Sequence, residues 1–128
     1  VAAYRTGMAD IHNIRGEYAA ALEMLEELPI QELNMTRKAI ALYGVGRVDE
    51  SDQLLESIKS VPVAEARMAV AMIYANRGDN AKAFEWLEQV DGISPWNMVY
   101  DAYLRVMVDD PGWKPWVDSL DWPWEYEY

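Results

Sequence analysis

Few side chains in this chain are arranged in a pattern that could perform catalysis or hold a metal ion. His12 is the single histidine, and the sequence has no cysteine. No serine or cysteine nucleophile accompanies His12 in a known arrangement, so a packing role on its helix is favoured over a catalytic one. Asp109 and Asp110 are the best pair of carboxylates for a cation, but no calcium-loop spacing surrounds them, and a helix cap explains them more simply. We therefore predict no catalytic residue, no metal site and no cofactor.

The charge of the chain narrows the classes of partner. With 22 acidic and 11 basic residues, the net charge is −11. Such a chain repels a phosphate backbone, which disfavours nucleic-acid binding by this segment. The acidic residues are interpreted as a solubilising surface, with a site for a basic partner as the alternative. No apolar run reaches the roughly 20 residues that cross a bilayer, and no signal peptide opens the sequence. We expect no membrane contact and a cytoplasmic location, with the periplasm as the alternative.

Helical hairpins are the elements that would position a binding site, and residues 69–90 show the clearest one. Apolar residues follow helical spacing on both sides of a short turn. Gly78 stands where the first helix must end, because glycine accepts the left-handed conformation that closes a helix. Asp79 places a carboxylate at the amino end of the second helix, where free N–H groups favour it. One hairpin cannot bury both of its apolar faces, so it needs neighbours.

The same pattern occurs three times along the chain. The turn glycines Gly16, Gly46 and Gly78 lie 30 and 32 residues apart. Five residues after each glycine stands a small residue, and nine residues after it stands a leucine. These positions are Ala21, Ser51 and Ala83, and Leu25, Leu55 and Leu87. Three matching turns at this period are typical of a stacked repeat array.

This period and pattern resemble the tetratricopeptide (TPR) family over about residues 2–90. The third hairpin matches best, and the second is poorest, because it is shorter than the usual repeat and has Lys38 at an apolar position. In the first hairpin His12 stands where an aromatic residue is usual. The matching residues are Met8, Ala9, Gly16, Tyr18, Ala21, Leu25 and Leu28 in the first hairpin, and Ala71, Tyr74, Gly78, Ala83 and Leu87 in the third. The resemblance implies an all-α fold, a right-handed superhelical stack of helical hairpins.

We accordingly expect a single TPR-like domain over residues 1–128. Its hairpins span about residues 2–28, 31–60 and 62–91. Ser94-Pro95 predicts a C-terminal capping helix over about residues 95–108, because a side-chain cap followed by proline is a strong helix start. Its apolar stripe would hold Trp96, Val99, Tyr100, Tyr103, Leu104 and Met107. Asp110-Pro111 repeats the device and predicts a short terminal helix, followed by an aromatic tail, over residues 110–128.

A second resemblance lies in residues 108–120. This segment is similar to the closing element of TPR arrays at the carboxyl end of certain multidomain bacterial proteins, which include adenylate cyclases, serine/threonine kinases and winged-helix regulators. The match is carried by Asp109, Asp110, Pro111, Trp113 and Leu120. Gly112 replaces a basic residue that is common in that group. The resemblance implies a terminal regulatory or docking domain whose catalytic or DNA-binding half lies outside this sequence.

The TPR resemblance also implies where a partner binds, because the first helix of each hairpin lines the concave face of such an array. Counted from the turn glycines, the predicted partner-binding residues are Thr6, Asp10, Asn13, Leu33, Thr36, Ile40, Tyr43, Met68, Met72 and Asn76. The paired lysines and asparagines that clamp a peptide carboxylate in chaperone-binding members are absent. We therefore expect an apolar, partly methionine-lined groove for a protein or peptide segment. The alternative is that Ile40, Met68 and Met72 pack against adjacent helices.

The carboxyl end is the other candidate surface. Trp122, Trp124, Tyr126 and Tyr128 occupy alternate positions, so an extended segment would present one aromatic face. We hypothesise that this tail caps its own chain or inserts into a second copy, which would give a homodimer. For the whole chain we predict a protein–protein interaction module without enzymatic activity. The alternative is a regulatory domain that senses a small ligand between the groove and the aromatic carboxyl end.

Overall fold

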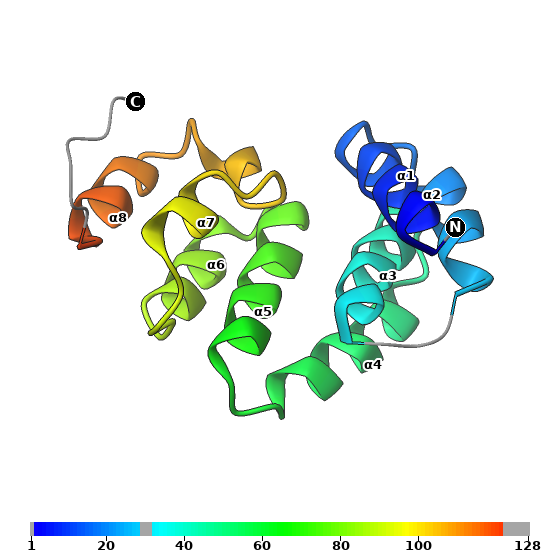
Figure 1. Ribbon diagram of the computed structural model, residues 1–128, viewed down its shortest axis with the longest axis horizontal. Coiled ribbons are helices and arrows are strands. Elements are labelled where there is room, and N and C mark those ends of the chain that lie inside the picture. The colour runs from blue at the N-terminus through cyan, green and yellow to red at the C-terminus, as the bar shows by residue number, and fades with distance from the viewer. Residues whose placement is uncertain (1, 29–31, 122–128) are drawn as a thin grey trace. The chain divides into compact units, whose positions relative to one another are not determined.

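The chain is helical throughout the part that the structure describes, which is residues 2–28 and 32–121 of a computed structural model (Figure 1). These residues contain no β-strand, so the all-α class is confirmed. Eight α-helices and one 3-10 helix follow one another in the described residues: α1 (Ala2–Ile14), α2 (Tyr18–Glu26), α3 (Glu32–Gly44), α4 (Val48–Lys59), α5 (Ala64–Asn76), α6 (Asn80–Leu87), α7 (Pro95–Val99), η1 (Arg105–Met107) and α8 (Trp113–Ser119). The chain divides into two compact units, Val1–Pro62 and Val63–Tyr128, and each is described by itself.

The first unit consists of two helical hairpins. Helix α1 packs against α2, α3 packs against α4, and α2 joins the hairpins by packing against α3. The centre of this unit is a buried cluster of Ala21 and Leu22 from α2 with Ala41 and Leu42 from α3, and Leu54 of α4 packs against it. The apolar faces of the two hairpins therefore cover each other, as one hairpin alone could not do.

All three hairpin turns close in the same way. Gly16, Gly46 and Gly78 have φ angles of 77°, 88° and 80°, a conformation that only glycine adopts without strain. In each turn the glycine N–H donates to the carbonyl three residues earlier, and the next residue donates to the carbonyl five residues earlier. This pair of hydrogen bonds is the Schellman closure of a helix. The predicted helix ends at the three glycines are confirmed.

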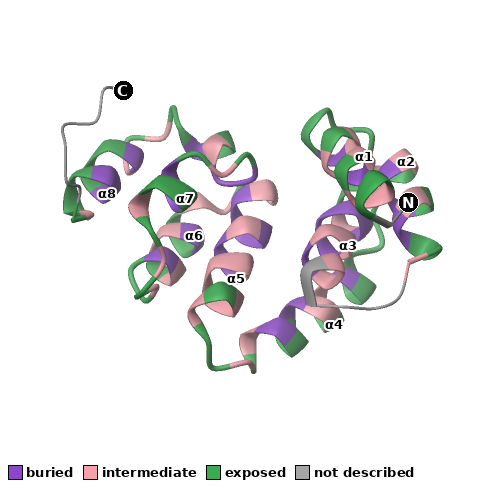
Figure 2. Cartoon of the chain, in the orientation of Figure 1, coloured by how far each residue is buried: buried purple, intermediate pink, exposed green. Residues whose placement is uncertain are grey.

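A pair of fully buried small residues also repeats in each hairpin. Ala21, Ser51 and Ala83, five residues after the glycine, are fully buried at 0 % exposure. The residues seven before the glycine are equally buried, and they are Ala9, Ala39 and Ala71. In the second hairpin the Ser51 Oγ donates to the Ala39 carbonyl at 2.6 Å, so these two positions face each other across the helix pair. The sequence period thus corresponds to a repeated packing unit, whose buried residues appear in purple in Figure 2.

The second unit contains the third hairpin and the carboxyl-terminal segment. Helix α5 packs against α6 and also contacts η1. Trp113, Trp116 and Val117 of α8 are buried. The ring of Trp116 lies 6.2 Å from that of Phe84 in α6, measured between centroids. The carboxyl-terminal segment therefore covers a face of the third hairpin.

The predicted capping helix over residues 95–108 is wrong in its extent, because α7 ends at Val99 and the chain turns before η1 begins. The Asp101 carboxylate accepts hydrogen bonds from the backbone N–H groups of Tyr103 (2.9 Å) and Leu104 (3.1 Å). Such a local bond competes with helical pairing and starts a new turn. The Arg105 guanidinium donates to the Val99 carbonyl at 3.1 Å, which satisfies the end of α7.

Two predicted helix starts also differ in detail. Pro95 does occupy the first position of α7, but the Ser94 side chain makes no capping hydrogen bond. Helix α8 begins at Trp113 rather than directly after Asp110-Pro111. The Asp110 Oδ1 accepts from the Gly112 N–H at 2.8 Å, so this carboxylate caps the turn that precedes the helix. The Asp79 cap is confirmed, since its side chain accepts from the Lys82 N–H at 3.4 Å.

Candidate functional site

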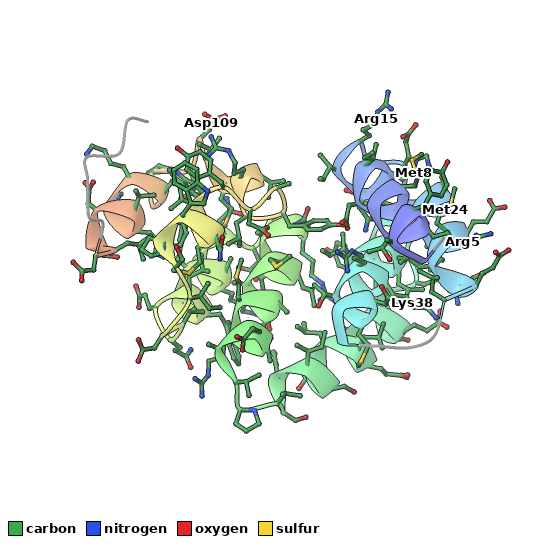
Figure 3. All side chains as sticks on the ribbon, in the orientation of Figure 1. Arg5, Met8, Arg15, Met24, Lys38 and Asp109 are labelled. Carbon is green, nitrogen blue, oxygen red and sulfur yellow. The ribbon has the colours of Figure 1, made fainter. Side chains whose placement is uncertain are left out.

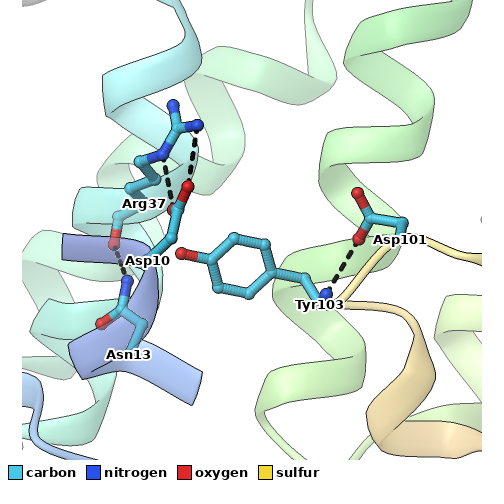
Figure 4. Close-up of polar contacts among 5 residues, drawn as sticks. All are labelled: Asp10, Asn13, Arg37, Asp101 and Tyr103. Atoms are coloured by element: carbon cyan, nitrogen blue, oxygen red, sulfur yellow. Dashed lines mark hydrogen bonds and ion pairs between the residues drawn. The ribbon is translucent and has the colours of Figure 1, made fainter. Parts of the chain in front are cut away.

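Two of the three predicted binding residues of α1, Asp10 and Asn13, take part in a polar contact with α3 (Figure 4). The Asp10 carboxylate accepts two hydrogen bonds from Arg37, at 2.6 Å from Nε and 3.1 Å from Nη2. The Asn13 Nδ2 donates to the Arg37 carbonyl at 3.2 Å. Arg37 thereby ties the first helices of the two hairpins together. Two-point pairing of this kind fixes the orientation of both side chains.

Arg37 was absent from the predicted set, and it is the residue that brings Asp10 and Asn13 together. A signal was present in the sequence, since Arg37 is a basic residue in the first helix of the next hairpin. Its partner, however, lies 27 positions away. Helical spacing relates residues three or four positions apart and does not identify such pairs. The contact could be inferred only after the hairpins had been placed side by side.

The other predicted residues of the first unit differ in how far they are buried. Thr36 and Ile40 are buried, whereas Thr6 and Tyr43 are half-buried. Leu33 lies in α3, but its side chain is outside the described residues. Ile40 therefore contributes to packing, as the alternative interpretation expected. Tyr43 is half-buried, and its assignment to a partner stays a prediction.

In the second unit the predicted residues lie on α5. Met68, Met72 and Asn76 are all half-buried. The Asn76 Nδ2 donates to the carbonyls of Met72 at 2.8 Å and Tyr103 at 3.0 Å. Asn76 therefore fastens the segment after α7 onto α5. The two methionines remain a partly exposed apolar surface, and the assignment of this surface to a partner stays a prediction.

Two aromatic residues of the predicted apolar stripe over residues 95–108 are exposed. Trp96 and Tyr100 are 51 % and 46 % exposed. Their ring centroids are 4.5 Å apart, and the Arg105 guanidinium lies 5.5 Å from the Tyr100 ring. The buried side of α7 is instead formed by Met98 and Val99. Exposed aromatic rings beside a guanidinium can hold a flat group.

Asp110 is the carboxylate with the clearest electrostatic role in the second unit. It accepts from the Asn80 side chain at 2.9 Å, and this bond, followed by the one from the Gly112 N–H, lowers the pKa of Asp110. A carboxylate held by two donors in this way links the start of α6 to the turn before α8. Its neighbour Asp109 is exposed and extends outward (Figure 3). This arrangement fits the cap that the sequence indicated.

The remaining candidate residues, which are His12, possible metal ligands and the aromatic tail, either make structural contacts, form no metal-binding group in the described part of the chain, or lie outside it. The His12 Nδ1 lies 3.1 Å from the Glu17 carboxylate, at the end of α1. The described ranges contain no group of three histidine, aspartate or glutamate side chains placed to share a metal ion. The aromatic tail residues Trp122, Trp124, Tyr126 and Tyr128 lie outside the described residues. No described helix is both long enough and apolar enough to cross a membrane.

No family model matches the chain, and no curated protein or solved structure is detectably similar to it.

Proposed function

We propose that this chain is a protein–protein interaction module of the tetratricopeptide type, in which three helical hairpins form a right-handed stack closed by the carboxyl-terminal segment. The observation that carries the proposal is the agreement of the three hairpins. Each has a glycine in the left-handed conformation, the same two closing hydrogen bonds and the same pair of fully buried small residues. Repeats of this kind are built to present extended surfaces to partners, and the proposal assigns no catalytic step.

The surface proposed for the partner lies on the first helix of each hairpin. In the first unit it includes the half-buried Tyr43 on α3. In the second unit it is the half-buried pair Met68 and Met72 on α5. Methionine adapts its shape to different partners, and a tyrosine offers an apolar ring with one polar group. An apolar peptide segment with a basic or amide group suits such a surface.

The proposal includes a place in a larger protein. The similarity of residues 108–120 to the closing element of bacterial regulators supports a terminal docking domain. Phe84, Trp113 and Trp116 meet in that segment. Asp110 holds the turn through Asn80 and Gly112. A closing element of this kind gives the third hairpin a neighbour, and the first helices remain available to a partner.

Selection from a random peptide library tests the proposal without a known partner. Peptides enriched on the wild-type chain should lose binding to Tyr43→Ala, Met72→Glu or the double variant, while circular dichroism shows unchanged helicity. Gln53→Ala on the exposed side of α4 is the matched control and should keep binding. If enriched peptides bind the double variant as well as the wild type, the proposed surface is wrong. If no peptide is enriched, the interaction function itself loses its support.

The exposed aromatic pair favours one second candidate, a regulatory domain that binds a small ligand. The rings of Trp96 and Tyr100 could contact a flat group, and the charged guanidinium of Arg105 could bind an acidic substituent on it. All six tryptophans lie in the second unit, so their fluorescence reports on it directly. Titration with a panel of metabolites should change this fluorescence in the wild type and not in Tyr100→Ala. A panel without effect would leave the peptide-binding proposal as the single candidate.

A further inference from the structure

Helix α1 carries an apolar stripe that faces solvent. Tyr4, Ile11 and Ile14 are 66 %, 47 % and 47 % exposed. Gly7 lies between them and is also exposed, and no atom is within 4 Å of the place where a Cβ would stand. The spacing of three, four and three residues puts all four on one side of the helix, as in the seam of a coiled coil. An apolar patch on an otherwise charged surface marks a place of contact.

The internal repeat shows that this kind of face is covered elsewhere in the chain. Counted from the turn glycines, the positions of Ile11 and Ile14 correspond to Ala41 and Gly44 in α3. Ala41 is fully buried in a cluster with residues of α2. A Cβ on Gly44 would stand 2.1 Å from the Cγ of Tyr18. Helix α2 therefore covers this face of α3, whereas no described residue of the first unit covers the same face of α1.

An exact repeat of the α2 contact does not fit on α1. In the contact of α2 with α3, the Tyr18 ring occupies the space that Gly44 leaves. Ile14 stands at the corresponding position of α1, and its side chain fills that space. The open space on α1 is instead at Gly7. A helix that docks here must place a large side chain over Gly7 and a residue of complementary shape against Ile14.

We propose that this face of α1 binds the same face of α1 in a second copy of the chain, with the two helices antiparallel. The spacing of the four residues is the same in both directions, so one antiparallel register pairs all four positions. Gly7 then faces Ile11 of the partner subunit, and Tyr4 faces Ile14 of the partner subunit. Each glycine receives an isoleucine, which lets the helices approach closely. Because the contact is self-complementary, it closes as a two-fold dimer.

The charges of α1 permit this contact although the chain as a whole is strongly acidic. A net charge of −11 opposes self-association, so a dimer must form through a part with little charge. Arg5 and Asp10 are the basic and acidic side chains of α1 that contribute to this net charge. Arg5 pairs with Glu27 at 2.6 Å, and Asp10 pairs with Arg37. Arg15 extends outward beyond the stripe (Figure 3), and in this register it faces the partner's Ala3, so like charges do not meet.

Sedimentation equilibrium of the full chain over a wide range of concentration tests the dimer. One helix pair gives an interface at the small end of the known range, so a weak dimer that depends on concentration is expected. Ile11→Glu should raise the dimer dissociation constant at least about tenfold, since a buried charge replaces a central apolar contact. Val106→Glu makes the same charge change at a site that is 51 % exposed, and it should leave the dimer unchanged. A monomer at every concentration, or equal weakening by both variants, overturns the proposal.

Cysteine crosslinking tests the register, because the natural chain has no cysteine. A mixture of Gly7→Cys and Ile11→Cys chains should form a mixed disulfide dimer under mild oxidation. Tyr4→Cys should not crosslink to itself, because ten residues at 1.5 Å each separate the two copies by about 15 Å along the helices. Crosslinking at position 4 would mean a parallel pair and would overturn the register. The double variant Trp122→Ala, Trp124→Ala should keep the dimer, and its loss would place the contact in the aromatic tail instead. A monomeric chain would leave the peptide-binding proposal untouched.

Discussion

The contact between Tyr18 and Gly44 offers a direct test of how the first two hairpins pack. In Gly44→Ala the new Cβ would stand 2.1, 2.2 and 2.6 Å from the Cγ, Cδ2 and Cδ1 atoms of Tyr18. Carbon atoms in contact normally lie about 3.5–4.0 Å apart, so the ring must move by more than about 1 Å. The atoms concerned are at the base of the ring, which cannot move without moving the whole side chain. Overpacking of this kind costs about 1–3 kcal/mol.

The backbone conformation of Gly44 adds no strain of its own to the Gly44→Ala variant. Its φ angle is not among the positive values of the described glycines, so alanine fits the local conformation. Alanine is favoured over glycine inside a helix by about 1 kcal/mol, and Gly44 is the last residue of α3, where this gain is smaller. We therefore expect the free energy of unfolding to fall by about 1–2 kcal/mol, the packing cost less the gain in helix propensity.

Gly7→Ala is the matched control, because it makes the same change in another helix with open space around the new Cβ. It should raise the free energy of unfolding by about 0.5–1 kcal/mol. Both variants are measured by urea denaturation followed by circular dichroism, at a concentration low enough to avoid self-association. Opposite signs for the two glycines are expected. If Gly44→Ala stabilises the chain as Gly7→Ala does, Tyr18 of α2 does not pack against Gly44 of α3.

A double-mutant cycle then assigns the cost to Tyr18. In a Tyr18→Ala background the ring is gone, so Gly44→Ala should become neutral or stabilising. The interaction energy of the two changes should be about 1–3 kcal/mol, as expected for residues in contact. An unchanged cost in the Tyr18→Ala background would refute the reasoning, since the destabilisation would then have a source other than the ring.

Three further predictions concern single positions. Hydrogen bonds from Asn80 and Gly112 hold the pKa of Asp110 below its ordinary value of 3.8, so its stabilisation is complete above that pH and is lost as the pH falls through the lowered value. The stability difference between the wild type and Asp110→Asn should therefore shrink in acid, as measured by thermal melting at a series of pH values. Asp109→Asn is the control. A stability difference that does not change with pH would contradict the proposed role of the Asp110 carboxylate. Ser51→Ala should cost no more than about 1 kcal/mol, because the other hairpins have alanine there, whereas Ser51→Leu should cost about 1–3 kcal/mol or more in urea unfolding. Gly78→Ala should cost about 1–2 kcal/mol, since alanine is strained at a φ of 80°, and an unchanged unfolding midpoint would count against that turn.

The hairpin turns could be predicted from the sequence because their causes are local. A glycine that ends an apolar-periodic run, followed by a small residue and a leucine at fixed distances, determines the turn and one side of the helix contact. The partner of that contact, Ala39 in the second hairpin, carries the same signal seven residues before the glycine. Alone, an alanine inside a helix does not indicate such a contact, because alanine is common at every position of a helix. Only the repetition at Ala9 and Ala71 makes it specific.

The extent of the predicted helix over residues 95–108 could not be obtained from apolar spacing alone. The stripe there is regular enough for one helix, yet Asp101 stands inside it and binds the N–H groups of Tyr103 and Leu104. Aspartate competes with helical hydrogen bonding wherever its carboxylate reaches the backbone. Whether it does so at a given position depends on what the alternative turn gains by packing, and here Leu104 and Met107 become fully buried.

The candidate site shows a second limit of sequence reasoning. Counted from the turn glycines, Asp10, Ile40 and Met72 occupy one position of the repeat. The first pairs with Arg37, the second is buried and the third is half-buried. A repeat therefore predicts where a side chain stands, but its role depends on the neighbour that it meets in the folded chain. That neighbour is set by non-local packing, which differs between a hairpin at the start of the series and one inside it.

Comparison of equivalent repeat positions also explains why the carboxyl-terminal segment has Trp116 and Gly112. Leu22 and Phe84 stand six residues after their turn glycines, at one position of the repeat. Leu22 packs against the next hairpin through Ala41, whereas no hairpin follows α6 in the described residues. Phe84 instead contacts Trp116, and a Cβ on Gly112 would stand 2.9 Å from its ring. The indole ring of Trp116 and the turn at Gly112 therefore cover Phe84 in the third hairpin, as α3 covers Leu22 in the first. This explains why Trp113 and Trp116 are buried in the second unit.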